Sequence, residues 1–344
     1  MRYQSYVNIS EIIAQQLNEY LESFCNKNPV FKDLLNDYSK KRIHLNGIQF
    51  YAGLNATKGN IKFEEILDIP IAIECIMLMA YKTNRILDHK QEVWDSEEKI
   101  KQTMLDEIMF LTLILKLLEN SRKKLGWKYN QVRDIFLDMI ANINEGFRYE
   151  KYFLNSKFSS LENITKNWSL KYQKRNILFN SIYDYAPLIW YYISSNDKTI
   201  FSKYKNNVKD EDKFSHAGQI INDLSDFSSI FDENVKSYQD AFSDIRNGVI
   251  TLPTFLLIKE QSILNALDDA KLTKNIDWRK EVMQLITKNN ILGKIKKLTK
   301  QSYIANIDFW KNIMKIDNEL LFSTYLLLLK NKYFNEFKKQ NKIN

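Results

Sequence analysis

The chain has 344 residues, a formal net charge of +8, and only 8 glycines and 4 prolines. Its basic runs are short and its lysines are scattered among acids, so we expect no nucleic-acid partner; a solvated lysine-rich surface or a pocket for an anionic substrate accounts for the charge. The length would permit two domains, but scarce turn residues and the lack of a Pro/Gly/Ser-rich linker favour one all-α domain over residues 1–344.

Apolar residues recur at helical spacing along almost the whole chain, and no stretch alternates with the period of two that is typical of strands. Two helix starts carry signals of their own. Asp68 precedes Ile69 and Pro70, which predicts a capped start with proline in the first turn, and residues 95–98 have the pattern of a capping box. In chain order, we expect helices over residues 9–25, 41–56, 68–88, 95–118, 128–154, 166–194, 211–231, 250–265, 276–289, 292–314 and 317–338.

Neither a secretory signal nor a membrane-spanning helix is predicted. The N-terminal residues lack a long apolar run, and the most apolar stretch, residues 108–118, contains Lys116 and is shorter than the ~20 residues that cross a bilayer. Cys25 and Cys75 lie far apart and show no metal-ligand spacing. We therefore expect a cytoplasmic protein with reduced, buried thiols and no transmembrane segment.

Two segments place acids or amides one helical turn apart on otherwise apolar helices. Asn84 and Asp88 share a face at the end of the 68–88 helix, and Asn222 and Asp226 share a face of the 211–231 helix. Oxygen ligands on two facing helices suit Mg²⁺, which takes a few carboxylates together with substrate phosphates. Asp and Asn near helix ends also serve as caps or as solvated surface residues, and this alternative remains open.

Other common sites have no support in the sequence. The three histidines, His44, His89 and His216, show no zinc-binding pattern. We find no phosphate-binding glycine loop and no Ser/His/Asp arrangement. The acid and amide pairs are therefore the candidates that carry chemistry.

The second segment resembles a known family. Residues 217–226 (AGQIINDLSD) are followed by residues 244–253 (DIRNGVITLP), and both the order and the spacing are similar to the second aspartate-rich region of trans-isoprenyl diphosphate synthases, F-Q-I-x-D-D-x-x-D and then D-x-x-x-G-K-x-T-L-P. Other segments between about residues 35 and 260 resemble further motifs: Ile73–Ile76 the E-x-I-H stretch, Lys41–His44 the G-K-x-x-R loop, Gly146 with Glu150 the G-Q-x-x-D motif, and Lys174–Phe179 the K-T-x-x-L-F helix.

The departures from the family pattern bear on activity. Asn84 and Arg85 stand where the first motif has two aspartates, and Asn222 replaces the leading aspartate of the second. His44 and Val249 replace basic residues, and the Arg-Arg-Gly that follows the first motif in the family is missing. Because the lost basic residues belong mainly to the site for isopentenyl diphosphate, the resemblance favours chemistry on one diphosphate over chain elongation.

The resemblance implies a helical bundle of the isoprenoid synthase type and a class I mechanism. Up to three Mg²⁺ ions would draw diphosphate from an allylic prenyl diphosphate of fifteen or twenty carbons. The implied metal ligands are Asn84, Asp88, Asn222, Asp223, Asp226 and Asp244; the catalytic cations are Lys174 and Arg85; the substrate-binding residues are Lys41, Arg42, Met79, Ala80, Arg175 and Gln219. Phe50, Phe147, Tyr149, Phe179 and Tyr183 are aromatic candidates for stabilising a carbocation, although such residues also fit a plain core.

Several functions agree with this pattern. The carbocation can cyclise, as in a terpene synthase, which is a lyase, or react with an acceptor, as in a transferase. The alternative from another class is a non-catalytic or regulatory subunit of a heteromeric prenyl diphosphate synthase, because the same substitutions in the metal motifs would fit an inactive chain. We expect a homodimer, with a heterodimer as the alternative.

Overall fold

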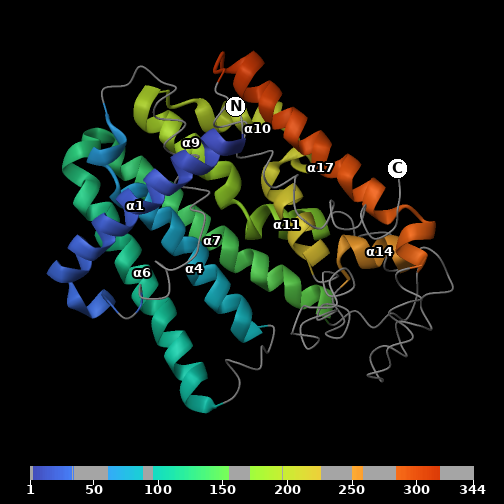
Figure 1. Ribbon diagram of the computed structural model, residues 1–344, viewed down its shortest axis with the longest axis horizontal. Helices are drawn as coiled ribbons and strands as arrows, with labels where there is room; N and C mark the ends of the chain where they lie inside the picture. The colour runs from blue at the N-terminus through green and yellow to red at the C-terminus, as the bar shows by residue number, and fades with distance from the viewer. Residues whose placement is uncertain are drawn as a thin grey trace. The chain divides into compact units, whose positions relative to one another are not determined.

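The computed structural model describes residues 3–32, 34, 61–87, 96–154, 171–195, 197–225, 250–258 and 284–317. Within these ranges the regular structure is helical and contains no strand, which confirms the predicted fold class (Figure 1). The α-helices are α1 (Tyr3–Lys27), α4 (Asp68–Leu87), α6 (Glu97–Leu125), α7 (Tyr129–Leu154), α9 (Ile182–Ser195), α10 (Ile200–Asn207), α11 (Phe214–Ser225), α14 (Leu252–Ile258) and α17 (Ile291–Asp308). Residues 171–179 and 284–288 are also helical, and α17 continues into a π-helical segment, Phe309–Ile313.

The chain divides into two compact units. The first comprises Met1–Ile143, Ile182–Asn207 and Trp310–Thr324, and the second comprises Asn144–Ser181, Val208–Phe309 and Tyr325–Asn344. Helix α7 therefore contributes its first part to one unit and its last turns to the other. A single domain over residues 1–344 stays a prediction.

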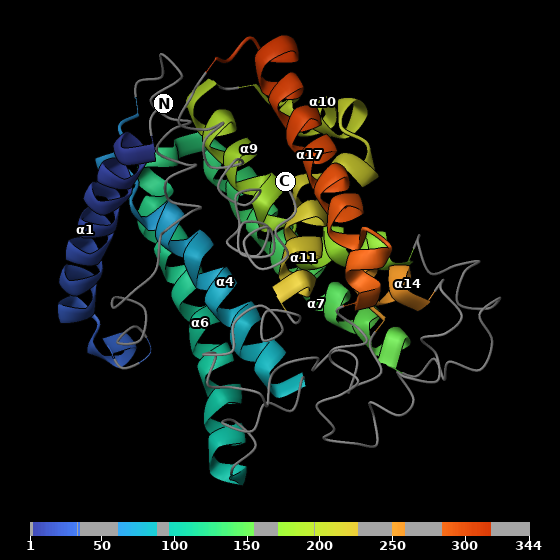
Figure 2. The same cartoon turned by 45° about the vertical axis from the view of Figure 1, so that its right-hand side comes forward.

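In the first unit, α4 and α6 lie side by side (Figures 1 and 2). Helix α6 buries one stripe of apolar residues at helical spacing and leaves the opposite face exposed; the buried stripe is Phe110, Leu113, Ile114, Leu117 and Leu118. The predicted helix start is confirmed, and Ser96 Oγ caps α6 by accepting a hydrogen bond from the backbone nitrogen of Lys99 at 3.2 Å. Because the third residue after this cap is Lys99 and not a carboxylate, the predicted capping box is not what forms. After its end, Gly126 has a φ of 56°, which glycine adopts without the strain of a side chain.

Asp68 is the first residue of α4, so the predicted start is confirmed, but the predicted cap is wrong. Its carboxylate is buried and accepts hydrogen bonds from Tyr20 of α1 and from Asn120 of α6. Burial raises the pKa of the Asp68 carboxyl, and these hydrogen bonds oppose the shift. The Asp68 side chain therefore links α4 to α1 and α6 instead of capping the start of α4.

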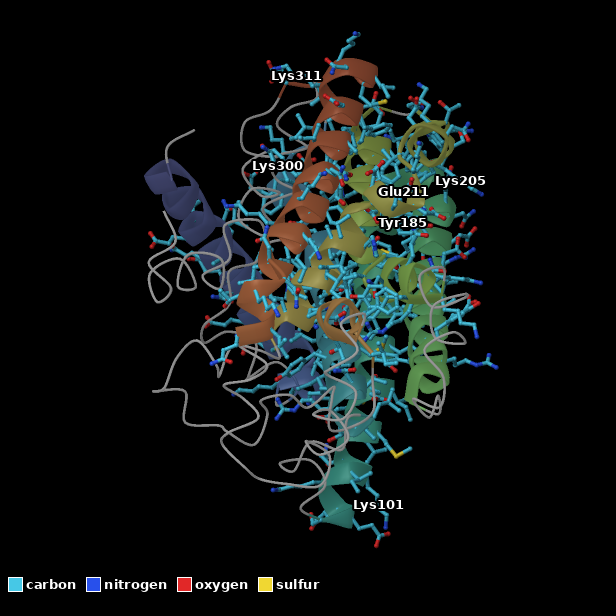
Figure 3. The ribbon with its side chains drawn as sticks, turned by 90° about the vertical axis from the view of Figure 1, so that its right-hand side faces the viewer. Lys101, Tyr185, Lys205, Glu211, Lys300 and Lys311 are labelled. Carbon is cyan, nitrogen blue, oxygen red and sulfur yellow. The ribbon has the colours of Figure 1, made fainter. Side chains whose placement is uncertain are left out.

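In the second unit, α17 packs against α11, and the two lie side by side in both views (Figures 1 and 2). Two side chains of α17 also hold the short 3-10 helix Asp210–Asp212 that precedes α11. Asn306 Nδ2 donates to the carbonyl of Asp212 at 3.0 Å, and Ser302 Oγ donates to the carbonyl of Glu211, labelled in Figure 3, at 3.5 Å. These contacts place the start of α11.

The remaining predicted helices agree with the structure in part. The predicted helix 166–194 is wrong as one element, because Asn180 and Ser181 form a turn between residues 171–179 and α9. Helix α10 was not predicted. The predicted helix 41–56 lies outside the described residues, as does the predicted helix 317–338 beyond its first residue. None of the described helices is long and apolar enough to cross a bilayer.

Candidate functional site

The described residues include about two thirds of the predicted site. Met79, Ala80, Asn84 and Arg85 lie on α4 in the first unit. Lys174 and Arg175 lie on helix 171–179, and Gln219, Asn222 and Asp223 lie on α11, all in the second unit. Lys41, Arg42, Asp88, Asp226 and Asp244 lie outside the described residues, as does the aromatic candidate Phe50.

On α4, the predicted pocket floor and the predicted cation differ in exposure. Met79 and Ala80 are buried, whereas Asn84 and Arg85 are half-buried one turn further on. The Arg85 guanidinium lies over the ring of Tyr81, 5.1 Å from its centroid, and donates a hydrogen bond to the Tyr81 hydroxyl. Tyr81 is one turn earlier on the same helix, so this pair holds Arg85 along the α4 surface.

The last turns of α4 are fixed to α6 by polar contacts around Asn84. Lys82 Nζ forms a part-buried ion pair with Asp106 of α6. Burial raises the pKa of the neighbouring Glu107 carboxyl, and a hydrogen bond from Thr83 opposes that shift. These contacts join the end of α4 to α6.

Lys174 is an exposed cation beside an aromatic ring. Its Nζ lies 3.6 Å from Glu145 Oε1 and 4.8 Å from the ring centroid of Tyr149, both on α7. A hydrogen bond with Tyr149 raises the pKa of Lys174, and the charge of Glu145 adds to the effect. Lys174 therefore stays protonated near neutral pH, as a cation that meets an anionic ligand from solvent must.

Arg175, the next residue, points to the interior. Its side chain is 5% exposed and that of Asp223 on α11 is 2% exposed, and Arg175 Nη1 lies 3.5 Å from Asp223 Oδ2. Arg175 Nη1 also donates to Asn176 Oδ1 at 3.3 Å. Helix 171–179 thus presents one cation outward and the next one to a buried carboxylate.

The Asp223 carboxylate accepts two further hydrogen bonds. Tyr172 Oη donates to Asp223 Oδ2 at 2.5 Å, and Gln219 Nε2 donates to Asp223 Oδ1 at 2.6 Å. Burial, together with the charge of Asp223, raises the pKa of Tyr172 well above its ordinary value, so the hydroxyl remains a donor. Both carboxylate oxygens are therefore held by side chains of the protein.

The same two helices are joined at two other points. Asn180 Nδ2 donates to Gln219 Oε1 at 2.6 Å, and Asn176 Nδ2 lies 3.1 Å from His216 Nδ1. Burial lowers the pKa of His216 to about 4, although Glu211 and Asp210 raise it, so the ring is neutral and its Nδ1 accepts. We call this set the polar seam; its members are Tyr172, Arg175, Asn176, Asn180, His216, Gln219 and Asp223.

The polar seam fixes the rotation of α11 about its own axis. Asp223 is buried against helix 171–179, whereas Asn222, about 100° around the helix, is exposed. The sequence reasoning included Arg175, Gln219 and Asp223 but missed the other four members. Their signal was polar side chains at spacings of three and four on otherwise apolar helix faces.

The described residues alone make no metal centre: among them, no group of three or more His, Cys, Asp or Glu side chains is placed to hold an ion. The predicted oxygen donors that are described are Asn84, half-buried, Asn222, exposed, and Asp223, buried in the polar seam. Asn222 has the donor type and the exposure that a Mg²⁺ site needs. The three other predicted carboxylates lie outside the described ranges.

Comparisons with known proteins give similarity in structure only. No protein-family model and no curated protein sequence match the chain. Geranylgeranyl pyrophosphate synthase from Lactobacillus brevis ATCC 367 is similar with a TM-score of 0.67 at 13% identity, covering 94% of this chain and 97% of that one. Decaprenyl diphosphate synthase from Rhodobacter capsulatus has a TM-score of 0.66 at 13% identity, covering 96% and 99%.

A third similar structure was solved with ligands. It is geranylgeranyl pyrophosphate synthase from Corynebacterium glutamicum, complexed with isoprenyl diphosphate and magnesium; its TM-score is 0.66 at 15% identity, and the match covers 93% of this chain and 97% of that one. Identities this low show the fold. The chain has the all-α isoprenoid synthase fold of the polyprenyl diphosphate synthases over nearly its whole length.

Proposed function

We propose that this chain, with its isoprenoid synthase fold, is a class I enzyme that ionises an allylic prenyl diphosphate with the help of Mg²⁺. The observation that carries the proposal is the rotation of α11. The polar seam turns Asp223 inward and leaves Asn222 exposed, which is the orientation that a metal-facing first position of this motif requires. Asp226, four residues after Asn222, shares its helical face by spacing.

The residues proposed to hold Mg²⁺ are Asn84, Asp88, Asn222, Asp226 and Asp244. Two of the five are neutral amides, so their affinity for Mg²⁺ is lower than that of an all-aspartate set, and the substrate diphosphate brings much of the negative charge. The chemistry that Mg²⁺ supplies when bound is neutralisation of the diphosphate as it leaves.

Lys174 is proposed to hold the diphosphate from the solvent side. Its exposed Nζ and its raised pKa support this role, and the nearby Glu145 offers a place for the ammonium when no anion is present. Arg85 is proposed to assist it as a point of positive charge, and the Tyr81 ring restricts where the guanidinium can lie.

Met79 and Ala80 are proposed as the floor of the prenyl pocket. Both are buried, and alanine with an adaptable methionine leaves room for a chain of fifteen or twenty carbons. Replacing Ala80 with Phe should shorten the preferred substrate in a competition between geranyl and geranylgeranyl diphosphate. An unchanged preference would place the floor elsewhere.

The fate of the carbocation is proposed to be cyclisation or transfer to an acceptor. Phe147 and Phe179 meet edge to face, with ring centroids 4.7 Å apart, and aromatic faces of this kind stabilise a cation in a water-free site. Chain elongation with isopentenyl diphosphate is disfavoured because His44 and Val249 replace basic residues that the elongating family uses.

A second copy of the chain is proposed to cover the outer face of α6. Met104, Ile108, Leu111 and Leu115 are exposed on that face at helical spacing. The first turn of α6 carries Glu97 and Glu98 and its last turn carries three basic residues, 122–124; Lys101 extends near the acidic end (Figure 3). In an antiparallel pair of α6 helices, this apolar stripe packs against the same stripe of the second copy.

The second candidate is a non-catalytic subunit of a heteromeric prenyl diphosphate synthase. The substitutions Asn84, Arg85 and Asn222 in the aspartate-rich motifs favour it. The two functions differ in one assay, the release of diphosphate from farnesyl or geranylgeranyl diphosphate by the purified chain with Mg²⁺. If the chain is an enzyme, it releases diphosphate without any partner protein. If it is a subunit, it releases none until the partner protein is added.

A further inference from the structure

Arg175 and Asp223 were both predicted to contact the ligand, yet they contact each other. We propose that Arg175 is a positioning residue: its buried ion pair with Asp223 holds α11 in register against helix 171–179 and so directs Asn222 outward, and neither member of the pair contacts metal or diphosphate. This inference rests on the proposed function, because it assigns the pair a role in the same diphosphate site.

The surroundings of Arg175 argue against a diphosphate contact. Its side chain is 5% exposed, one residue from Lys174, whose side chain is 54% exposed. The guanidinium contacts Asp223 and Asn176, and its carbon lies 6.0 Å from the ring centroid of Tyr172. An anion from solvent would have to displace Asp223 to reach it, and breaking a buried ion pair leaves an uncompensated buried charge.

The surroundings of Asp223 argue against metal ligation in the same way. A carboxylate has about four lone-pair sites, and three donors, from Tyr172, Gln219 and Arg175, contact the carboxylate of Asp223. A metal ion would have to enter a region where the side chain is 2% exposed and compete with a guanidinium of the same sign. The charge of Asp223 is therefore neutralised within the protein.

The pair lies between the other contacts of the polar seam. On one side the contacts run from Tyr172 of helix 171–179 to Asn180 in the turn that follows it. On α11 they run from His216 to Asp223, so that each set extends over about two helical turns. Contacts spread over two turns restrain both sliding and rotation of α11. The direction of the Asn222 side chain depends on this restraint. Loosening the Arg175–Asp223 pair therefore moves the Asn222 side chain without removing any metal ligand.

The resembled motif has threonine where Arg175 stands, so the ion pair belongs to this chain's own version of the site. With a threonine, the Asp223 charge would remain and add to the acidity around Asn222. With Arg175 present, the charge of Asp223 is neutralised, so the negative charge of the proposed Mg²⁺ site comes from its other acidic residues. A prediction that follows is that removing both charges together harms the site less than removing either one.

The test compares wild type, Arg175→Gln, Asp223→Asn and the double variant. The readout is the Mg²⁺ concentration that gives half-maximal binding of inorganic diphosphate in isothermal titration calorimetry, with the melting temperature measured alongside. We expect each single variant to raise this concentration by about tenfold or more and the double variant to return to within about threefold of wild type, because it leaves no unpaired buried charge.

Two results would overturn the proposal. If the double variant binds Mg²⁺ and diphosphate as weakly as Asp223→Asn, Asp223 is a metal ligand; if it is as weak as Arg175→Gln, Arg175 contacts the anion.

Should a single variant fail to fold, Tyr172→Phe replaces it, since it loosens Asp223 without creating an unpaired charge. We expect the half-saturating Mg²⁺ concentration of Tyr172→Phe to rise by about threefold. An unchanged half-saturating concentration contradicts the positioning role. If the wild-type protein binds no diphosphate in the presence of Mg²⁺, the proposed function itself is wrong. That result differs from the two above, which contradict only the positioning role of Arg175.

Discussion

Gly146 of α7 lies directly against the backbone of Phe179: a Cβ at position 146 would come within 2.9 Å of the Phe179 nitrogen and 3.0 Å of its Cα. Contacts this short with backbone atoms cannot be relieved by turning a side chain. The two helices of the second unit that carry Tyr149 and Lys174 therefore approach each other through this glycine.

Gly146→Ala should destabilise the protein by about 1–3 kcal/mol, because the overpacking outweighs the ~1 kcal/mol that alanine usually gains over glycine inside a helix. The measurement is urea unfolding followed by circular dichroism. Gly293→Ala in α17 is the matched control: the atoms nearest to its Cβ would be those of the Asn290 side chain, which can rotate away. A stabilised Gly146→Ala variant would show that the helices are not in this close contact.

Tyr172→Phe should destabilise the protein by about 1.5–3 kcal/mol, since it removes a hydrogen bond to a buried, charged acceptor. The control is Tyr192→Phe, whose hydroxyl is buried and has no hydrogen-bond partner among the described residues. Losing that hydroxyl should be neutral or stabilising in the same urea experiment. Equal effects of the two changes would contradict the assigned contact between Tyr172 and Asp223.

His216 should make stability depend on pH. Its pKa is lowered by burial from 6.5 to about 4, so the unfolded chain binds the proton more tightly, and stability is lost as pH falls from about 6.5 toward 4. The loss between pH 7 and pH 4 is at most about 3 kcal/mol. His216→Gln keeps an acceptor for Asn176 and removes the titration, so the difference between the two unfolding curves isolates His216. Parallel curves would mean that the ring is accessible to protons in the fold.

Ile108→Lys should convert a dimer into a monomer in size-exclusion chromatography with light scattering. The Ile108 side chain is 62% exposed at the middle of the α6 stripe, where a partner helix would bury a lysine ammonium without a counter-ion. Leu298→Lys, on the exposed side of α17, is the control and should leave the dimer intact. A monomeric wild type would remove the proposal that a second copy covers α6.

The sequence predicted the helices well where apolar spacing was continuous, as in α4, α6 and α7. It missed the turn at Asn180 and Ser181 because apolar residues on either side, Leu178 and Ile182, continue the helical pattern across it. Ser181 N instead bonds to the Leu178 carbonyl at 3.4 Å, one residue closer than an α-helix requires. At this turn Asn180 Nδ2 donates a hydrogen bond to Gln219 Oε1 of α11, a contact between distant residues that apolar periodicity cannot indicate.

The candidate site shows a different limit of the sequence. Position 223 falls in an acidic motif, which favoured a metal ligand, but only one donor to its carboxylate, Gln219, is close in sequence. The other two, Tyr172 and Arg175, lie 51 and 48 residues earlier. Local spacing cannot reveal partners at that separation. Asn222 shows the same limit, because it is exposed although Ile221 and Asp223 on either side of it are buried.

The most direct test of the account is diphosphate release from farnesyl and geranylgeranyl diphosphate by the purified chain, with and without Mg²⁺. We predict release that requires Mg²⁺ and falls by ~100-fold or more in Asp88→Ala and Asp226→Ala, because each removes stabilisation of the leaving group worth several kcal/mol. Asn84→Asp should retain or improve release at low Mg²⁺, since it restores a charged ligand at the same spacing. The account would be contradicted if the wild-type chain alone released no diphosphate and the three variants, Asp88→Ala, Asp226→Ala and Asn84→Asp, released none either. The chain would then be a subunit that needs a catalytic partner.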